Sequence, residues 1–124
     1  MKTRKEYTCP LELTHDVIKG KWKPIILWQL WQHQSLSELK EGIAGISQKM
    51  LIEQLKELME YGMVDKKSYE GYPLRVEYFL TERGQKMRKA VEIMQSIGIE
   101  MMVEQDNTDF LKEKGLISEE DERR

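Results

Sequence analysis

Three side chains near the middle of the chain could hydrogen bond to the edges of nucleic-acid bases: Gln48, Lys49 and Glu53. A carboxamide donates and accepts in the pattern that adenine needs, an ammonium group reaches guanine or a phosphate, and a carboxylate accepts from the amino group of cytosine. Their spacing places all three on one side of a helix. An ordinary solvated surface helix shows the same residue types. The neighbouring elements must therefore decide between a helix that contacts bases and an ordinary surface helix.

A short turn and one amphipathic helix are expected to present these side chains. Gly45 suits a turn with positive φ, and Ser47 can accept from the first free amides of a helix that ends near Tyr61. The apolar stripe of this helix consists of Leu51, Leu55, Leu58 and Gly62. The candidate DNA contacts on it are Ser47, Gln48, Lys49, Ile52, Glu53 and Lys56. Helix-turn-helix proteins insert such a helix into the DNA major groove, so the first hypothesis is DNA binding.

Three helices are expected ahead of this one. Residues 11–18 predict a short helix opened by Pro10. Its inward residues are predicted to be Leu11, Leu13 and Ile18. Residues 22–31 are apolar nearly all round, tryptophans included, which predicts a buried central helix. Ser35 to Glu38 matches a capping box and opens a third helix, whose apolar residues are Leu36, Leu39 and Ile43.

After Gly62 the periodicity changes from helical to alternating. Alternation runs over residues 64–68 and again over residues 75–80, and Glu70 to Pro73 form the turn between them. A two-stranded hairpin directly behind a helix-turn-helix defines a winged helix. The predicted fold class is therefore mainly α with a small antiparallel β wing, a winged helix-turn-helix.

A long last helix, roughly residues 82–103 with Thr81 as its cap, is expected to join two copies of the chain. It carries too many apolar residues to project alone into water. The predicted DNA-binding and dimerisation domain covers residues 1–103. Residues 104–124 are predicted to form an acidic tail with one further turn or two around Phe110 and Leu111.

The composition excludes several classes of protein. A chain of 124 residues is one domain. No apolar run approaches the length of a membrane span and the polar start lacks a signal-peptide core, so we expect a cytoplasmic protein that contacts no membrane. One cysteine and two separated histidines disfavour a disulfide framework and a metal site. Because no nucleophile, paired carboxylate or oxyanion loop is visible, we expect no enzymatic activity and no cofactor.

Charge is unevenly distributed, although the net charge is only −2. Residues 19–89 hold 13 Lys and Arg against 9 Asp and Glu, whereas residues 90–124 hold 4 against 10. A basic middle can steer DNA onto one face. The candidate phosphate contacts are Lys21, Lys23, Ser35, Ser37, Lys40, Lys66, Lys67 and Arg75. For the serines the alternative is helix capping, and for Lys21 and Lys23 it is solvation beside a buried tryptophan.

Eight short segments carry a family likeness: Cys9-Pro10, Gly20 to Lys23, Ile26 to Trp28, Ser37 to Leu39, Gly45 to Leu51, Gln54-Leu55, Arg75 to Tyr78 and Leu80 to Gly84. In this order they resemble the HxlR-type, MarR-like family of bacterial winged helix-turn-helix transcription regulators. The resemblance implies a homodimer with the first and last long helices at its interface and two recognition helices on a palindromic operator. Relatives often show Thr and Gln where Ile52 and Glu53 stand, so base preference is not carried over there.

The only cysteine, Cys9, stands immediately before Pro10 and the first expected helix. A helix N-terminus and the nearby Lys5 would favour the thiolate form of Cys9. The alternative is that Cys9 packs as a small apolar residue at a dimer interface. The resemblance implies that Cys9 matches a cysteine with which some members sense electrophiles or oxidants. A small electrophile or oxidant is therefore the expected effector.

Together these features predict a dimeric transcription regulator of duplex DNA. A repressor is favoured over an activator, because a compact dimer can occlude a promoter. The alternative is a winged-helix adaptor that binds proteins and engages a basic partner through the acidic tail. Salt dependence separates the two, since a regulator that neutralises phosphates loses affinity steeply with added salt, whereas an adaptor has no measurable duplex affinity.

Overall fold

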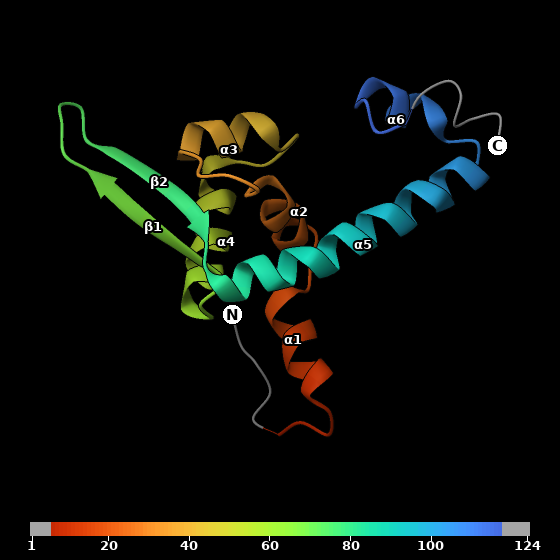
Figure 1. The fold of residues 1–124 in the computed structure, drawn as a ribbon, viewed down its shortest axis with the longest axis horizontal. Coiled ribbons are helices and arrows are strands. Elements are labelled where there is room, and N and C mark those ends of the chain that lie inside the picture. The colour runs from red at the N-terminus through yellow and green to blue at the C-terminus, as the bar shows by residue number, and fades with distance from the viewer. Residues whose placement is uncertain (1–5, 118–124) are drawn as a thin grey trace. The chain divides into compact units, whose positions relative to one another are not determined.

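The computed structural model describes residues 6–117, whose helices and strands are drawn in Figure 1. In chain order they are α1 (Pro10–Ile18), α2 (Trp22–Gln29), α3 (Leu36–Gly42), α4 (Gln48–Glu60), β1 (Val64–Tyr69), β2 (Arg75–Leu80), α5 (Glu82–Glu104) and α6 (Thr108–Glu113). The chain divides into two compact units, Met1–Lys89 and Ala90–Arg124, and α5 begins in the first and ends in the second. The mainly α class with a small antiparallel wing is confirmed.

Helix α1 begins at Pro10, as predicted, but packs only through its last turn. Asp16 and Val17 are buried, whereas Leu11 is 72% and Leu13 42% exposed. The prediction that these two leucines face inward is wrong. In Figure 1 the first turns of α1 point away from α2, α3 and α4, which leaves both leucines at the surface.

Helix α2 lies at the centre of the first unit's core. Its Ile26 and Leu27 are fully buried, together with Leu39, Leu51, Leu55 and Leu58 from α3 and α4. The helix ends at Gln29, because Leu30 has φ −88 and ψ 37 while its N–H still bonds to the carbonyls of Ile26 and Leu27. Trp31 therefore lies beyond the helix and is 64% exposed, so its predicted place in the core is wrong.

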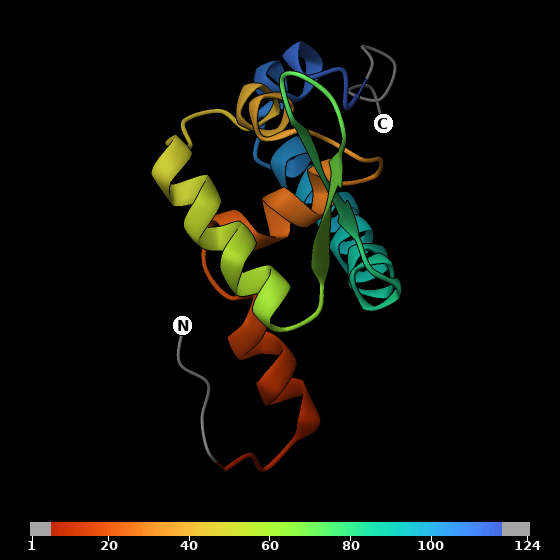
Figure 2. The same cartoon turned by 90° about the vertical axis from the view of Figure 1, so that its left-hand side faces the viewer.

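The helix-turn-helix forms from local signals that the sequence carries. Ser35 caps α3 in a complete capping box: its hydroxyl accepts from the Glu38 N–H at 3.2 Å, and the Glu38 carboxylate accepts from the Ser35 N–H at 3.0 Å. Gly45 turns the chain at φ +83, and the Ser47 hydroxyl accepts from the Met50 N–H at 3.1 Å. Figure 2 shows α4, drawn yellow to green, along one side of this unit after the turn from α3.

The wing is an antiparallel pair of strands in which Val64 faces Leu80 and Tyr69 faces Arg75. Val64 and Leu80 are buried at its base. The sequence did not predict one extension of this sheet: Gln34, between α2 and α3, exchanges backbone hydrogen bonds with Tyr78 at 3.0 and 2.7 Å. This bridge ties the loop before α3 to β2 and brings the start of α3 beside the wing.

Helix α5 starts directly after the wing. Thr81 caps it as predicted, since its hydroxyl accepts from the Gly84 N–H at 3.1 Å. Gly84 packs so tightly that a Cβ there would lie 1.9 Å from the Met63 carbonyl oxygen, so this position requires glycine. In the second unit α5 continues to Glu104, and α6 contains Phe110 and Leu111, where a further turn is expected.

The predicted division into a domain of residues 1–103 and a tail of residues 104–124 stays a prediction. Residues 1–5 of the predicted domain and residues 118–124 of the predicted tail lie outside the described residues. Within residues 6–117, no helix combines the length and the apolar character that crossing a bilayer requires.

Candidate DNA-binding site

Helix α4 turns the predicted polar face to solvent. Gln48, Lys49, Glu53 and Lys56 are exposed and Ile52 is half-buried, while Leu51, Leu55 and Leu58 are buried on the other side. Ser47, also exposed, accepts one hydrogen bond from the helix and keeps its hydroxyl hydrogen as a donor. The start of α4 thus offers amide, ammonium, hydroxyl and carboxylate groups on one open surface.

The predicted contacts on α3 lie next to the start of α4. A shallow hollow is lined by Leu36, Ser37, Lys40, Glu41 and Gln48. Ser37, Lys40 and Gln48 therefore border one surface. For Ser35 the capping alternative is confirmed, and its backbone N–H is the main reason that the pKa of Glu38 is lowered. A phosphate contact by Ser35 would have to use its hydroxyl hydrogen.

The two wing lysines are exposed on opposite faces of the hairpin. Lys66 stands opposite Tyr78 and Lys67 opposite Glu77, and successive pairs along a sheet alternate between its faces. Arg75 pairs with Tyr69, two positions from Lys67, and so shares the face of Lys67. One run of DNA backbone could meet Lys67 and Arg75 together, whereas Lys66 would need a separate contact.

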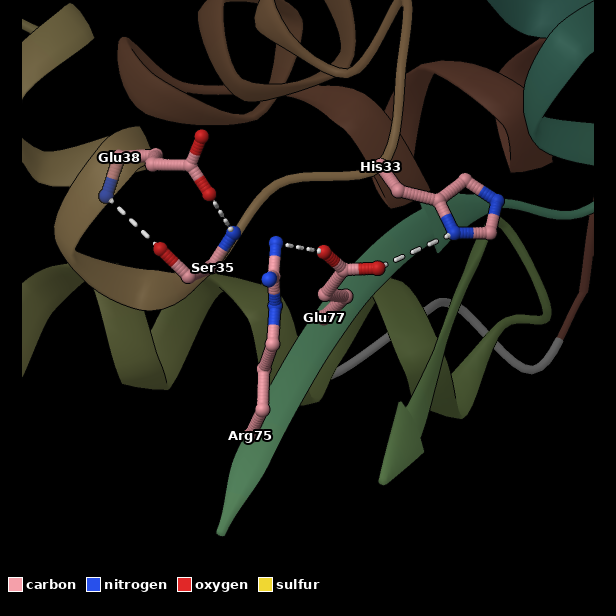
Figure 3. Close-up of polar contacts among 5 residues, drawn as sticks. All are labelled: His33, Ser35, Glu38, Arg75 and Glu77. Carbon is pink, nitrogen blue, oxygen red and sulfur yellow. Dashed lines mark hydrogen bonds and ion pairs between the residues drawn. The ribbon is translucent and has the colours of Figure 1, made fainter. Parts of the chain in front are cut away.

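Arg75 points from β2 toward the start of α3, as Figure 3 shows. Its Nη2 donates to Glu77 Oε2 at 2.6 Å. Its charge also contributes to the lowered pKa of Glu38, after the two hydrogen bonds with Ser35. Nδ1 of His33 lies 3.8 Å from Oε1 of Glu77. We call His33, Arg75 and Glu77 the wing cluster.

Lys23 does not belong to this surface. Its side chain is only 5% exposed, and its Nζ lies 2.5 Å from Oε2 of Glu57, which joins α2 to α4. The hydrogen bond with Lys23 is the main reason that the pKa of Glu57 is lowered. The prediction that Lys23 reaches phosphate is wrong, because α2 turns this residue toward α4. Lys21 is exposed, with its Nζ 4.5 Å from the centre of the Trp22 ring, and stays a candidate.

Cys9 is exposed at the N-cap position of α1, where its side chain makes no capping hydrogen bond. Glu12, in the first turn of the helix, accepts from the Thr8 N–H at 3.1 Å and from the Thr8 hydroxyl. The Glu12 carboxylate therefore brings a negative charge to the N-terminal turn that Cys9 precedes. Lys5, the expected cationic neighbour, lies outside the described residues.

Comparison with known proteins adds the family to this geometry. The model of the HxlR-like helix-turn-helix family matches residues 17–106, a range that includes α2, α3, α4, the wing and α5. The chain belongs to the HxlR-like family. The predicted family and the winged-helix class are confirmed.

Proteins similar to this HxlR-like chain are transcription regulators, not enzymes. The uncharacterized HTH-type transcriptional regulator YkvN of Bacillus subtilis (strain 168) is 42% identical over 89 residues, which are 71% of this chain and 75% of YkvN. The structure of the redox regulator HypR in its oxidized form is 38% identical with a TM-score of 0.71, and the match covers 74% of this chain and 96% of HypR. Diamide-treated YodB from B. subtilis is 32% identical with a TM-score of 0.64, covering 73% of this chain and 92% of YodB.

Sequence reasoning missed two members of the wing cluster of this HxlR-like chain. Glu77 carried a usable signal, because residues two apart in a strand share a face and Glu77 therefore had to lie beside Arg75. His33 carried none, since the bridge between Gln34 and Tyr78 that brings it to the wing joins segments far apart in the sequence.

Proposed function

We propose that this HxlR-like regulator binds duplex DNA with α4 in the major groove and the wing against the backbone. The observation that carries the proposal is the division of α4 into a buried leucine side and an exposed side headed by Gln48 and Lys49. Residues at the N-terminus of this helix are the ones that reach base edges in helix-turn-helix complexes. Glu53 then meets a cytosine amino group and the half-buried Ile52 a thymine methyl group.

Phosphate contacts surround this helix in the proposed complex. Ser37 and Lys40 border the hollow beside Gln48, and Lys67 and Arg75 share a wing face. The remaining candidates are Lys21, Ser35, Ser47, Lys56 and Lys66. Such contacts set position and register, and they make affinity dependent on salt.

The functional unit in this proposal is a homodimer on a palindromic operator. In the second unit, α5 exposes an apolar stripe with Ile93 at 64%, Met94 at 52%, Ile97 at 49% and Met101 at 51%. Their spacing of three and four residues puts them on one side of the helix, where a second copy would remove them from water. Two-fold symmetry then matches two inverted half-sites, and a bound dimer that overlaps a promoter represses transcription.

Cys9 is the proposed sensor of an oxidant or electrophile. The exposure of Cys9 at the N-cap of α1 and the similarity of this chain to the redox regulator HypR support this role. Oxidation by diamide would remove one hydrogen from each of two Cys9 thiols and form an S–S bond between two chains, while diamide takes up both hydrogens. A quinone would instead form a carbon–sulfur bond with one thiol, whose hydrogen passes to the quinone and leaves a hydroquinone adduct.

Selection of bound duplexes from a random pool tests this function, with the reduced protein and with diamide-treated protein. We expect inverted half-sites spaced by about one DNA turn or a near multiple. Affinity for the selected duplex should fall steeply with salt, and diamide should lower it in the native protein but not in Cys9→Ser. A pool without enrichment would point to a protein-binding adaptor, and equal diamide responses would remove Cys9 from the proposal.

A further inference from the structure

The exposed charge of Arg75 is compensated within the protein. The Arg75 side chain is 66% exposed, whereas the side chain of Glu77, whose Oε2 lies 2.6 Å from Nη2, is only 12% exposed. Burial raises the pKa of the Tyr69 hydroxyl on the facing strand, and the nearby Glu77 carboxylate raises that pKa further. Glu77 is therefore a fixed acceptor that competes with a DNA phosphate for Arg75.

His33 is held at the other oxygen of the same carboxylate. Its ring stacks on Phe79 with centroids 4.8 Å apart and planes 15° apart, and its Nδ1 lies 3.8 Å from Glu77 Oε1. The two backbone hydrogen bonds between Gln34 and Tyr78 fix the neighbouring residue of the loop to β2. The bridge thus fixes the backbone next to His33, and the imidazole must give up its stack on Phe79 to move away from Glu77.

The charged groups around Glu77 come from three elements. From the wing these are Arg75, Lys67 directly opposite Glu77, the Tyr69 hydroxyl, and Asp65, which stands opposite Phe79 on the same face. His33 comes from the loop before α3, and Glu38, whose pKa Arg75 helps to lower, comes from α3. With neutral His33, the pair of Arg75 and Glu77 has no net charge. With protonated His33, the wing cluster carries one uncompensated positive charge.

We propose that His33 is a positioning residue that controls, through Glu77, whether Arg75 is free to bind a DNA phosphate. The proposal rests on the proposed DNA binding. A protonated imidazole shares the carboxylate and weakens its hold on Nη2, so the guanidinium can turn both of its outer nitrogens to a phosphate. Because DNA then favours the protonated imidazole, duplex affinity rises as pH falls through the range in which histidines titrate.

Fluorescence anisotropy with a fluorescein-labelled random-sequence duplex and the full-length protein tests this relay at about pH 8 and about pH 6. In the native protein, the slope of log affinity against log salt should steepen by about 0.9 at the lower pH, as expected for one added phosphate contact. His15→Gln is the matched control, because His15 is the only other histidine and is exposed on α1. His15→Gln should keep the pH response and His33→Gln should lose it.

Two further variants separate the relay from simpler roles of His33. Glu77→Gln cannot compensate Arg75, so it should bind more tightly than the native protein at the higher pH and respond little to pH. Arg75→Gln should bind weakly at both pH values with no change in slope. A pH response that survives in Arg75→Gln would mean that His33 contacts DNA itself. A pH response that survives in His33→Gln would mean that another group titrates. Either result overturns the inference.

Failure of the proposed function would look different. In that case the native protein would show no measurable affinity for the duplex at either pH. Loss of folding in His33→Gln would not hide the result, because Glu77→Gln and Arg75→Gln test the same relay and leave the stack of His33 on Phe79 in place.

Discussion

At the scale of single residues, Gln48 and Lys49 occupy the positions on α4 from which base edges would be read. Replacing either one by alanine should relax base preference at one operator position, with roughly 1–3 kcal/mol of discrimination lost for each bidentate contact. Competition binding with operator variants that differ by single base pairs measures this loss.

Lys67→Ala serves as the contrast for these two changes. A lost phosphate contact should weaken all sequences alike and reduce the salt slope by about one. Lys86→Ala removes an exposed lysine of α5 outside the proposed site and should change neither quantity. Base preference that shifts more in Lys67→Ala than in the α4 variants would contradict the proposed docking.

The structure also predicts what restrains Cys9. Glu12 lies in the first turn of α1 and holds Thr8, so its negative charge stands close to the helix N-cap that Cys9 occupies. Glu12→Gln should therefore increase the rate of Cys9 alkylation by iodoacetamide severalfold, as followed by mass spectrometry. Cys9→Ser should take up no label. An unchanged rate in Glu12→Gln would mean that this carboxylate does not control the thiol.

At the scale of elements, the ion pair between Lys23 and Glu57 braces α2 against α4. The pKa of Glu57 is lowered in the folded state, so the pair stabilises the fold fully above the unfolded-state pKa. That contribution is lost as pH falls through the lowered, folded-state pKa. The native protein should therefore lose unfolding free energy as the solution is acidified through this range.

Glu57→Gln tests this brace by urea unfolding at a series of pH values. At neutral pH the variant should lose about 3 kcal/mol or more, because Lys23 stays nearly buried without a charged partner. Its stability should also depend less on pH in the acid range. Glu53→Gln, which changes an exposed carboxylate of the same helix, is the matched control. Identical pH profiles for the two variants would contradict a special role of Glu57.

At the scale of the whole molecule, the apolar stripe on α5 predicts how two copies assemble. Ile97→Glu places a charge in the middle of this stripe and should produce monomers, because a buried unpaired carboxylate costs more than the interface gains. Sedimentation equilibrium measures the mass, and affinity for a two-half-site operator should fall with it. Ser96→Glu adds the same charge at an exposed position beside the stripe. This variant should still have the mass of a dimer. Monomeric native protein would contradict the proposed assembly.

The sequence by itself determined the elements of this protein, because their signals are local. The turn at Gly45, the cap at Ser47 and the capping box at Ser35 each involve backbone groups only a few residues away. The spacing of the leucines in α4 is enough to identify its buried side. The change of periodicity after Gly62 likewise predicted the two strands of the wing. These signals located the outer face of α4 and hence the candidate contacts Gln48 and Lys49.

Only the tertiary structure decided which polar residues are free to act. A lysine on α2 carries the same local pattern whether it faces solvent or another helix, and only packing against α4 shows that Lys23 belongs to Glu57. The same holds for Leu11 and Trp31, whose apolar character does not tell whether anything covers them. The wing cluster depends on a bridge between Gln34 and Tyr78 that no short-range pattern encodes, because its hydrogen bonds join backbone groups that every residue except proline possesses.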